Sequence, residues 1–182
     1  MKISSSQLIS ELTTITQQHI QYVETLLQKT DQELNHRTSE NSWSVLECIE
    51  HLNLYGGFYI PEITHRISSS HSTTKTTFSP GILGNYFAKS MLPKEKLNTM
   101  KTFKTMNPIR AKLDKGVLKK FIWQEQQLLV LLEKSRNINL EKTKTSISIS
   151  KLIKLKLGDT LRFVIYHNVR HIEQAKKVLL AV

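Results

Sequence analysis

Two histidines stand four residues apart in the stretch 166–174, which reads YHNVRHIEQ. On an α-helix, His167 and His171 would lie on one face with Cβ atoms ~5–6 Å apart, so both imidazoles could reach a single metal ion. Gln174 follows His171 by three residues and extends the same face. The spacing therefore predicts one half of a metal site, carried on a helix.

A facial metal site needs a further ligand, and the best candidate lies in the stretch 43–52, WSVLECIEHL, which contains His51. Cys48 is the single cysteine of the chain, which excludes an internal disulfide and a cysteine-rich zinc site and leaves nitrogen and oxygen as the ligand atoms. Three neutral imidazoles leave open positions on a divalent ion, where water or a substrate thiolate can bind with a lowered pKa. The alternative is that each histidine is an ordinary hydrogen-bonded group on a helical surface.

Several residues near the histidines could contribute to catalysis or could be structural. Glu47 precedes His51 by four residues, so it could orient an imidazole or act as a base, but a solvated glutamate at a helix start has the same pattern. Gln174 could hold a substrate or a bound water. Tyr55 could do the same through its hydroxyl, although core packing is its simpler role. Cys48 falls in an apolar stripe that suits an inert buried thiol better than a nucleophile.

Four segments with apolar residues at helical spacing must position these side chains: 5–29, 42–68, 114–135 and 159–181. His51, His167 and His171 each sit at the edge of an apolar stripe, where a groove between packed helices would open. His19 falls inside a stripe, and we interpret it as a hydrogen-bonded core histidine rather than part of a central site. The pattern predicts an all-α protein, an antiparallel four-helix bundle with long crossover connections, folded as a single domain over residues 1–182.

Two connections interrupt the helical pattern. Residues 69–114 are rich in serine, threonine and lysine and contain three of the four prolines, which predicts a long excursion with short helices at most. We expect it to lie over or beside the mouth of the metal groove and to be mobile without substrate. In the connection 136–158, residues 146–150 alternate like a strand without an obvious partner, so an extended segment or short helix is expected. Gly158 and Asp159 are expected to cap the last helix.

The net charge of +11 is unevenly distributed along the chain. Residues 1–69 carry −4, residues 70–120 carry +9 and residues 121–182 carry +6. A solvated basic loop explains this excess better than a nucleic-acid-binding surface, because no nucleic-acid-binding motif accompanies it. Attraction of a small anionic substrate is compatible with the same charge.

The composition is that of an ordinary globular protein, with 39% apolar residues. No run approaches the ~18 consecutive apolar residues of a membrane helix, so no membrane partner is expected. The first residues, MKISSS, lack an apolar segment and a small-residue cleavage site, and we therefore expect the cytoplasm as the location.

Together, the two histidine stretches resemble the DinB superfamily, which includes the YfiT-like metal-dependent hydrolases. The motifs are Trp43-Ser44-x-x-Glu47-x-x-x-His51-Leu52 and, far downstream, His167-x-x-x-His171-x-x-Gln174. The resemblance covers nearly the whole chain and implies a four-helix bundle with a long crossover, with the motifs on its second and fourth helices. It also implies that His51, His167 and His171 bind one divalent ion, nickel or zinc being those usually associated with the family.

The resemblance implies no single reaction. Some relatives transfer low-molecular-weight thiols such as bacillithiol or mycothiol, and others isomerise thiol adducts. We therefore expect a metal-dependent enzyme, a thiol S-transferase or hydrolase, acting on a small-molecule substrate such as a low-molecular-weight thiol. The alternative, from a different class, is a non-catalytic helical-bundle protein that binds or dimerises and whose metal site is structural or vestigial.

Overall fold

The computed structural model describes residues 2–93 and 102–181 and is mostly helical. Its α-helices are α1 (Ser5–Leu26), α2 (Asp31–Asn35), α3 (Val45–Ser68), α4 (Ile82–Met91), α5 (Gly116–Ser135) and α6 (Leu157–Leu179). A 3-10 turn, η1 (Lys104–Met106), and the strands β1 (Ile3–Ser4), β2 (Thr77–Phe78), β3 (Lys144–Ile147) and β4 (Ser150–Lys156) complete it. Within the described residues, none of the helices has both the length and the hydropathy to cross a bilayer.

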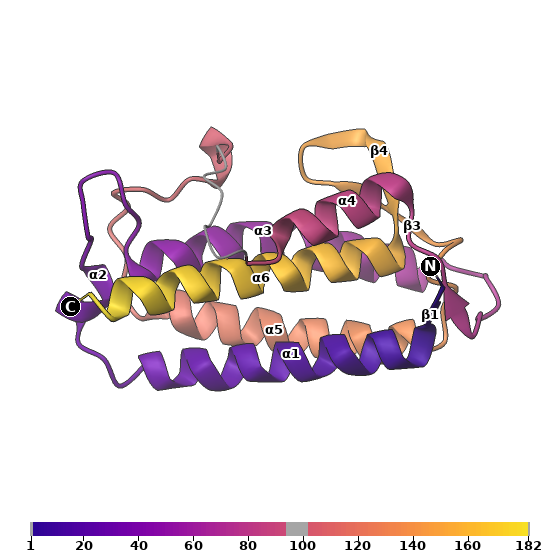
Figure 1. Cartoon of the computed structure of the whole chain (residues 1–182), viewed down its shortest axis with the longest axis horizontal. Coiled ribbons are helices and arrows are strands. Elements are labelled where there is room, and N and C mark those ends of the chain that lie inside the picture. The colour runs from indigo at the N-terminus through magenta and orange to yellow at the C-terminus, as the bar shows by residue number, and fades with distance from the viewer. Residues whose placement is uncertain (1, 94–101, 182) are drawn as a thin grey trace.

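The four long helices, α1, α3, α5 and α6, lie side by side (Figure 1). Helix α5 packs against α1 and α3, and α6 packs against α3 and α1. The colour gradient shows α1 and α6 running in one direction and α3 and α5 in the other. Helix α3 with α6, and α1 with α5, are therefore antiparallel as expected, whereas α3 with α5, and α1 with α6, are parallel neighbours. A parallel pair needs a long connection between its members, which the residues between Ser68 and Gly116 supply.

The buried apolar side chains form two clusters, one toward each end of the four long helices. The first joins the beginnings of α1 and α6 to the ends of α3 and α5, and it includes Leu12, Ile63, Leu132 and Leu161. The second joins the opposite halves and includes Val23, Ile49, Phe121 and Ile172. Along α3 and α6, the predicted ligand histidines lie where the two clusters meet.

The long helices start and end within three residues of the predicted limits. Helix α3 begins at Val45 because Ser44 and Glu47 form a capping box: the Ser44 hydroxyl accepts the Glu47 N–H at 3.2 Å, and the Glu47 carboxylate accepts the Ser44 N–H at 2.8 Å. The prediction that Asp159 caps α6 is wrong. Asp159 lies in the first turn of the helix, where its carboxylate accepts the Gly81 N–H at 2.7 Å and pairs with Arg162 at 3.2 Å.

The two connections contain more structure than predicted. The expectation of an unpaired segment at 146–150 is wrong, because β3 pairs with β4 in an antiparallel hairpin that has an irregularity between Ser146 and Ile147. Helix α4 packs on α6, and β2 pairs with β1. The part of the predicted mobile excursion at 94–101 lies outside the described residues.

Candidate metal centre

The antiparallel packing of α3 on α6 brings the three predicted ligand histidines together. Across the interface between α3 and α6, His51 faces His171 and Tyr55 faces His167, and the ring centroids are 4.5 Å apart in each pair. His51 also lies beside His167, at 5.0 Å between ring centroids. All three side chains are buried. The i, i+4 spacing on α6 and the matching position on α3 are thus sufficient to form a single cluster.

The nitrogen atoms of this cluster are arranged as a metal site requires. One ring nitrogen from each of His51, His167 and His171 lies within 4.8 Å of the others. Two nitrogens that bind the same ion at ~2.0–2.1 Å are separated by about 3–3.4 Å. His51 Nε2 and His167 Nε2 are 3.2 Å apart, within that range.

Two of the imidazoles are oriented by hydrogen bonds on their outer nitrogens. His51 Nδ1 lies 2.6 Å from the carbonyl oxygen of Met106, which can only accept, so Nδ1 carries the proton. His171 Nδ1 lies 2.9 Å from Gln174 Oε1, another acceptor. In both residues the Nε2 lone pair is left for the cluster, as in proteins in which an outer hydrogen bond fixes the tautomer of a metal-binding histidine.

Burial keeps the three imidazoles neutral, the form in which histidine binds a metal. It lowers the pKa of His51 to about 4, against the opposing hydrogen bond to Met106. Burial and the nearby His51 lower the pKa of His171 to about 3. The pKa of His167 is held well below its usual range by burial and by the neighbouring His171, His51 and Arg170. A buried group of three neutral nitrogen donors suits a divalent cation.

The stability of the metal-free protein is expected to fall as the pH drops below about 6.5. Folded-state pKa values of about 4 for His51 and about 3 for His171 lie below the ordinary value, so the unfolded chain takes up these protons first. The stabilisation is therefore complete above the unfolded pKa and is lost as the pH falls through the folded values. Urea unfolding midpoints across this range measure the effect. A variant with all three histidines replaced by glutamine is expected to show a shallower slope, and equal slopes would contradict the assignment.

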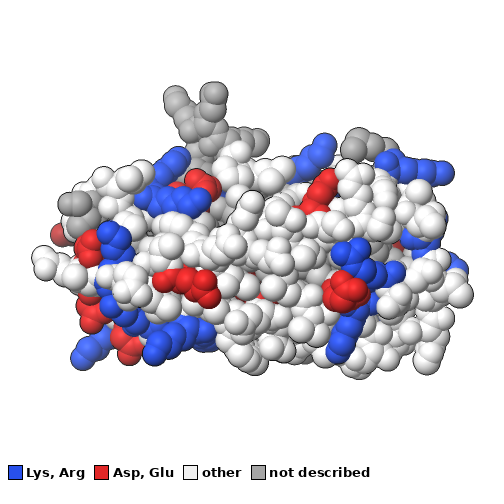
Figure 2. Space-filling view, turned by 90° about the horizontal axis from the view of Figure 1, so that it is seen from below, with Lys and Arg blue, Asp and Glu red and all other residues white. Residues whose placement is uncertain are grey.

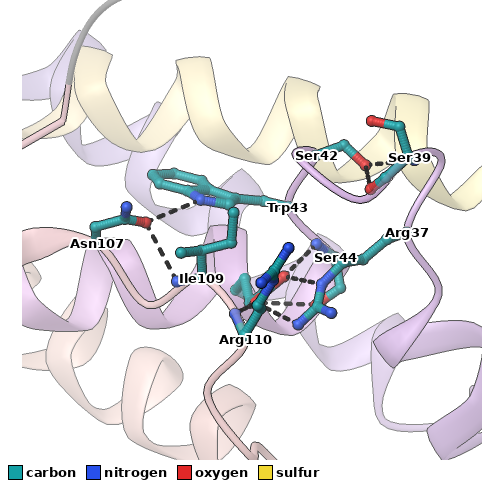
Figure 3. Close-up of polar contacts among 9 residues, drawn as sticks. Arg37, Ser39, Ser42, Trp43, Ser44, Asn107, Ile109 and Arg110 are labelled. Carbon is teal, nitrogen blue, oxygen red and sulfur yellow. Dashed lines mark hydrogen bonds and ion pairs between the residues drawn. The ribbon is translucent and has the colours of Figure 1, made fainter.

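A loop from the long excursion lies against His51 of the cluster and is attached to α3 beside it. It includes η1 and supplies the Met106 carbonyl. Trp43 stacks at a tilt on His51, with centroids 4.7 Å apart, and its Nε1 donates to Asn107 Oδ1 at 3.1 Å (Figure 3). The expectation that the excursion lies beside the groove is thus met by these residues.

Glu47 anchors this loop, so the alternative of a solvated helix-start glutamate is wrong, whereas a role in catalysis stays a prediction. Its carboxylate accepts two hydrogen bonds from Arg37, at 2.6 and 2.8 Å, and further bonds from the backbone N–H groups of Ser44 and Arg110. Figure 3 shows Arg37, Ser44 and Arg110 pointing toward one another at this position. The side chain is 1% exposed, so it is not a solvated helix-start glutamate, and its partners are not the histidines. The sequence could not show this, because Arg110 comes from a distant loop.

Gln174 remains next to the histidines, where it was predicted. Its contact to His171 gives it an orienting role, and it also lines the adjacent cavity. Whether it also holds a substrate or a water stays a prediction. Tyr55 packs against the rings of His167 and His51 and lines the same cavity, so it combines a packing position with access to the site.

The two remaining candidates agree with their structural interpretations. Cys48 is fully buried, and burial raises the pKa of its thiol, which opposes formation of a nucleophilic thiolate. His19 pairs with Glu125 at 2.9 Å, and Glu125 also accepts from Asn168 at 2.8 Å. This buried link joins α1, α5 and α6 and lies apart from the three-histidine cluster, which has no fourth member among the described residues.

A cavity of about 700 Å³ opens beside the histidines and is large enough for a small organic ligand. Among its described lining residues the cation is Arg170, and none of the lysines of the basic segment 70–120 contributes. On the face seen in Figure 2, basic and acidic side chains lie near the two ends of the molecule and the middle is mostly uncharged. That face offers no continuous basic stripe of the kind that binds a nucleic-acid backbone.

The chain matches the model of a known protein family. The model of the DinB superfamily matches residues 11–175, a range that includes all three histidines and Gln174. No curated protein and no solved structure gives a significant match.

Proposed function

Because the chain belongs to the DinB superfamily, we propose that it is a metal-dependent enzyme acting on a small molecule, with His51, His167 and His171 as the ligands of one divalent ion. The observation that carries this proposal is the convergence of three buried, neutral imidazoles. Two of them, His51 and His171, are oriented by hydrogen bonds between their Nδ1 atoms and the oxygens of Met106 and Gln174. Three hydrogen-bonded surface histidines would need neither the burial nor the common meeting point. The all-nitrogen donor set suits nickel or zinc.

The chemistry that this ion would supply when bound is that of a Lewis acid with open positions, which favours deprotonation of a water or a thiol. The protein's own residues would prepare the site. Trp43 and the loop at Met106 cover the histidines on one side and limit access of water. The adjacent cavity, which Trp43 and Asn107 also line, admits a substrate, and Gln174 and Tyr55 line it within reach of a bound molecule. A thiol S-transferase or a hydrolase fits this arrangement, and a low-molecular-weight thiol is the proposed substrate class.

The cavity favours the enzyme over the alternative of a structural or vestigial metal in a binding or dimerising protein. A structural ion is usually enclosed by four protein ligands, whereas a catalytic ion keeps an open position. Here three histidines form the cluster and the open side faces a cavity of about 700 Å³. We further propose that the four long helices form the single-domain bundle implied by the family, on the strength of their side-by-side packing.

Metal content and activity together test this function. Protein purified without a histidine tag is expected to take up one nickel or zinc ion per chain. In a screen of thiols and electrophiles, transfer or hydrolysis is expected to disappear with a chelator and to return when the metal is restored. Failure to bind either metal would overturn the metal site. Activity that is indifferent to the chelator would overturn the metal-dependent enzyme while leaving the site intact.

A further inference from the structure

The cavity beside the histidines is elongated along the groove between α3 and α6. Three pairs of facing rings lie along it in order. They are His51 with His171, Tyr55 with His167 and, one helical turn further, Tyr59 with Phe163, whose ring centroids are 5.7 Å apart. The first and third pairs are separated by about 12 Å along the helix axes, at 1.5 Å per residue. The histidines therefore occupy one end of the cavity, and Tyr59 with Phe163 lies toward the other.

The histidine end of the cavity is polar. Asn41 and Ser42 line it beside Trp43, while Asn107 reaches it from the loop. Gln174 lines it from α6. These side chains offer hydrogen-bond donors and acceptors next to the three imidazoles.

The far end is built from apolar side chains of three separate elements. Helix α4 contributes Phe87, and the β3–β4 hairpin contributes Ile147 and Leu155. The hydroxyl of Tyr59, which lies there, already accepts a hydrogen bond from the Ser148 N–H at 3.3 Å. A polar or charged group placed at this end would lose hydration and find few partners, whereas an apolar group would gain from burial.

We propose that the site takes a substrate with two unlike ends: a polar, metal-coordinating group at the three histidines and an aromatic or branched aliphatic group of one or two rings between Tyr59, Phe163 and α4. This inference rests on the proposed function for its polar end. Its apolar end stands on the cavity alone. The volume of about 700 Å³ exceeds what a small polar molecule fills and lies within the range of pockets that enclose ligands of this size.

Two hydroxamates of different size test the inference on cobalt-loaded protein, with the visible spectrum of the ion as the readout. Both share the metal-binding group, and only benzohydroxamate carries a ring. Burial of ~100 Å² of ring surface along the cavity toward Tyr59 and Phe163 predicts that benzohydroxamate binds roughly 50-fold more tightly than acetohydroxamate. The ratio of the two affinities is the measured quantity, so a general change in metal binding cancels.

Two variants along the cavity and one matched control locate the effect. Phe163→Ala removes a side chain that lines the apolar end. Ser90→Trp narrows the passage between that end and the histidines from α4, with little change to the core, since Ser90 is half-buried and lines the cavity. In both, the affinity ratio is expected to fall toward one. Lys89→Trp places the same bulk on the adjacent exposed position and is expected to keep the parental ratio. Equal affinities in the parent, or a ratio unchanged in Ser90→Trp, would overturn the inference.

A second arm makes the result independent of the metal. The neutral fluorophore N-phenyl-1-naphthylamine is expected to bind the metal-free parent and Lys89→Trp, and to bind Ser90→Trp at least 10-fold more weakly, roughly the loss of one ring contact. If cobalt is not taken up but this pattern appears, the proposed metal function fails and the apolar end survives. If cobalt and acetohydroxamate bind but neither apolar probe responds to Ser90→Trp, only the inference fails.

Discussion

Replacing His167 by alanine is expected to lower the affinity for nickel or zinc by at least about 100-fold, because the loss of a direct ligand should exceed the effect of removing an outer hydrogen-bond partner. The two remaining histidines supply too few bonds to exclude competing water from the ion. His51→Ala and His171→Ala should have similar effects, since one nitrogen of each belongs to the same cluster. The metal-free fold should be less affected, because the apolar clusters on both sides of the site do not include these residues.

Metal titration of the three variants beside the parent measures this effect. His65→Ala is the matched control, because His65 lies on the same helix as His51 but is exposed. It is expected to retain the parental stoichiometry and affinity. Parental affinity in all three cluster variants would show that the ion, if any, binds elsewhere.

Replacing Glu47 by alanine is expected to reduce the free energy of unfolding by about 3 kcal/mol, the range for breaking a buried ion pair after allowing for a partly exposed partner. The substitution leaves Arg37 and the N–H groups of Ser44 and Arg110 without their shared acceptor. For a chain of this length the loss corresponds to a melting temperature lower by about 6–12 °C. Metal affinity should also fall, since the loop that supplies Met106 loses its anchor.

The pH dependence of the Glu47 contribution has a definite sign. Burial alone would raise the pKa of this carboxyl, but hydrogen bonds from Arg37, Ser44 and Arg110 outweigh it and hold the pKa below its usual value. The stabilisation is therefore present above the unfolded pKa and is lost as the pH falls through the folded one. Thermal unfolding of Glu47→Ala and Glu47→Gln measures the loss. Glu133→Ala, which removes an exposed ion-pair partner, is the control and should change stability by less than about 0.5 kcal/mol. Equal losses in the control and in Glu47→Ala would refute the anchoring role.

The histidine cluster and the long helices could be predicted because both follow from local spacing. The i, i+4 step fixes the relation of His167 to His171, and the apolar stripes fix which face of each helix turns inward. His51 could be included because it occupies the matching edge of its own stripe. No such rule connects His51 with Met106. Met106 contributes its backbone carbonyl, which every residue type has, so the sequence cannot indicate the contact.

The errors concern residues whose role depends on distant partners. The pattern around Glu47 fits a helix start, which is correct, but its ion pair depends on the path of the chain at Arg37 and Arg110. The β3–β4 hairpin was missed because β4, with the sequence SKLIKLK, has three lysines among its seven residues and a Leu152 that is 93% exposed. Such a strand lacks the buried alternation that periodicity can detect.

The order of the three histidines along the chain bears on when a metal ion could enter the proposed site during synthesis. The ribosome makes His51 on α3 long before His167, 116 residues later on the last of the long helices. A nascent chain that displays α3 alone would offer an ion a single imidazole, a weak ligand by itself. The other two lie on α6, so the three imidazoles come together only when α6 packs on α3. Binding of an ion by all three histidines would then follow folding, and the ion would not direct the earlier folding steps.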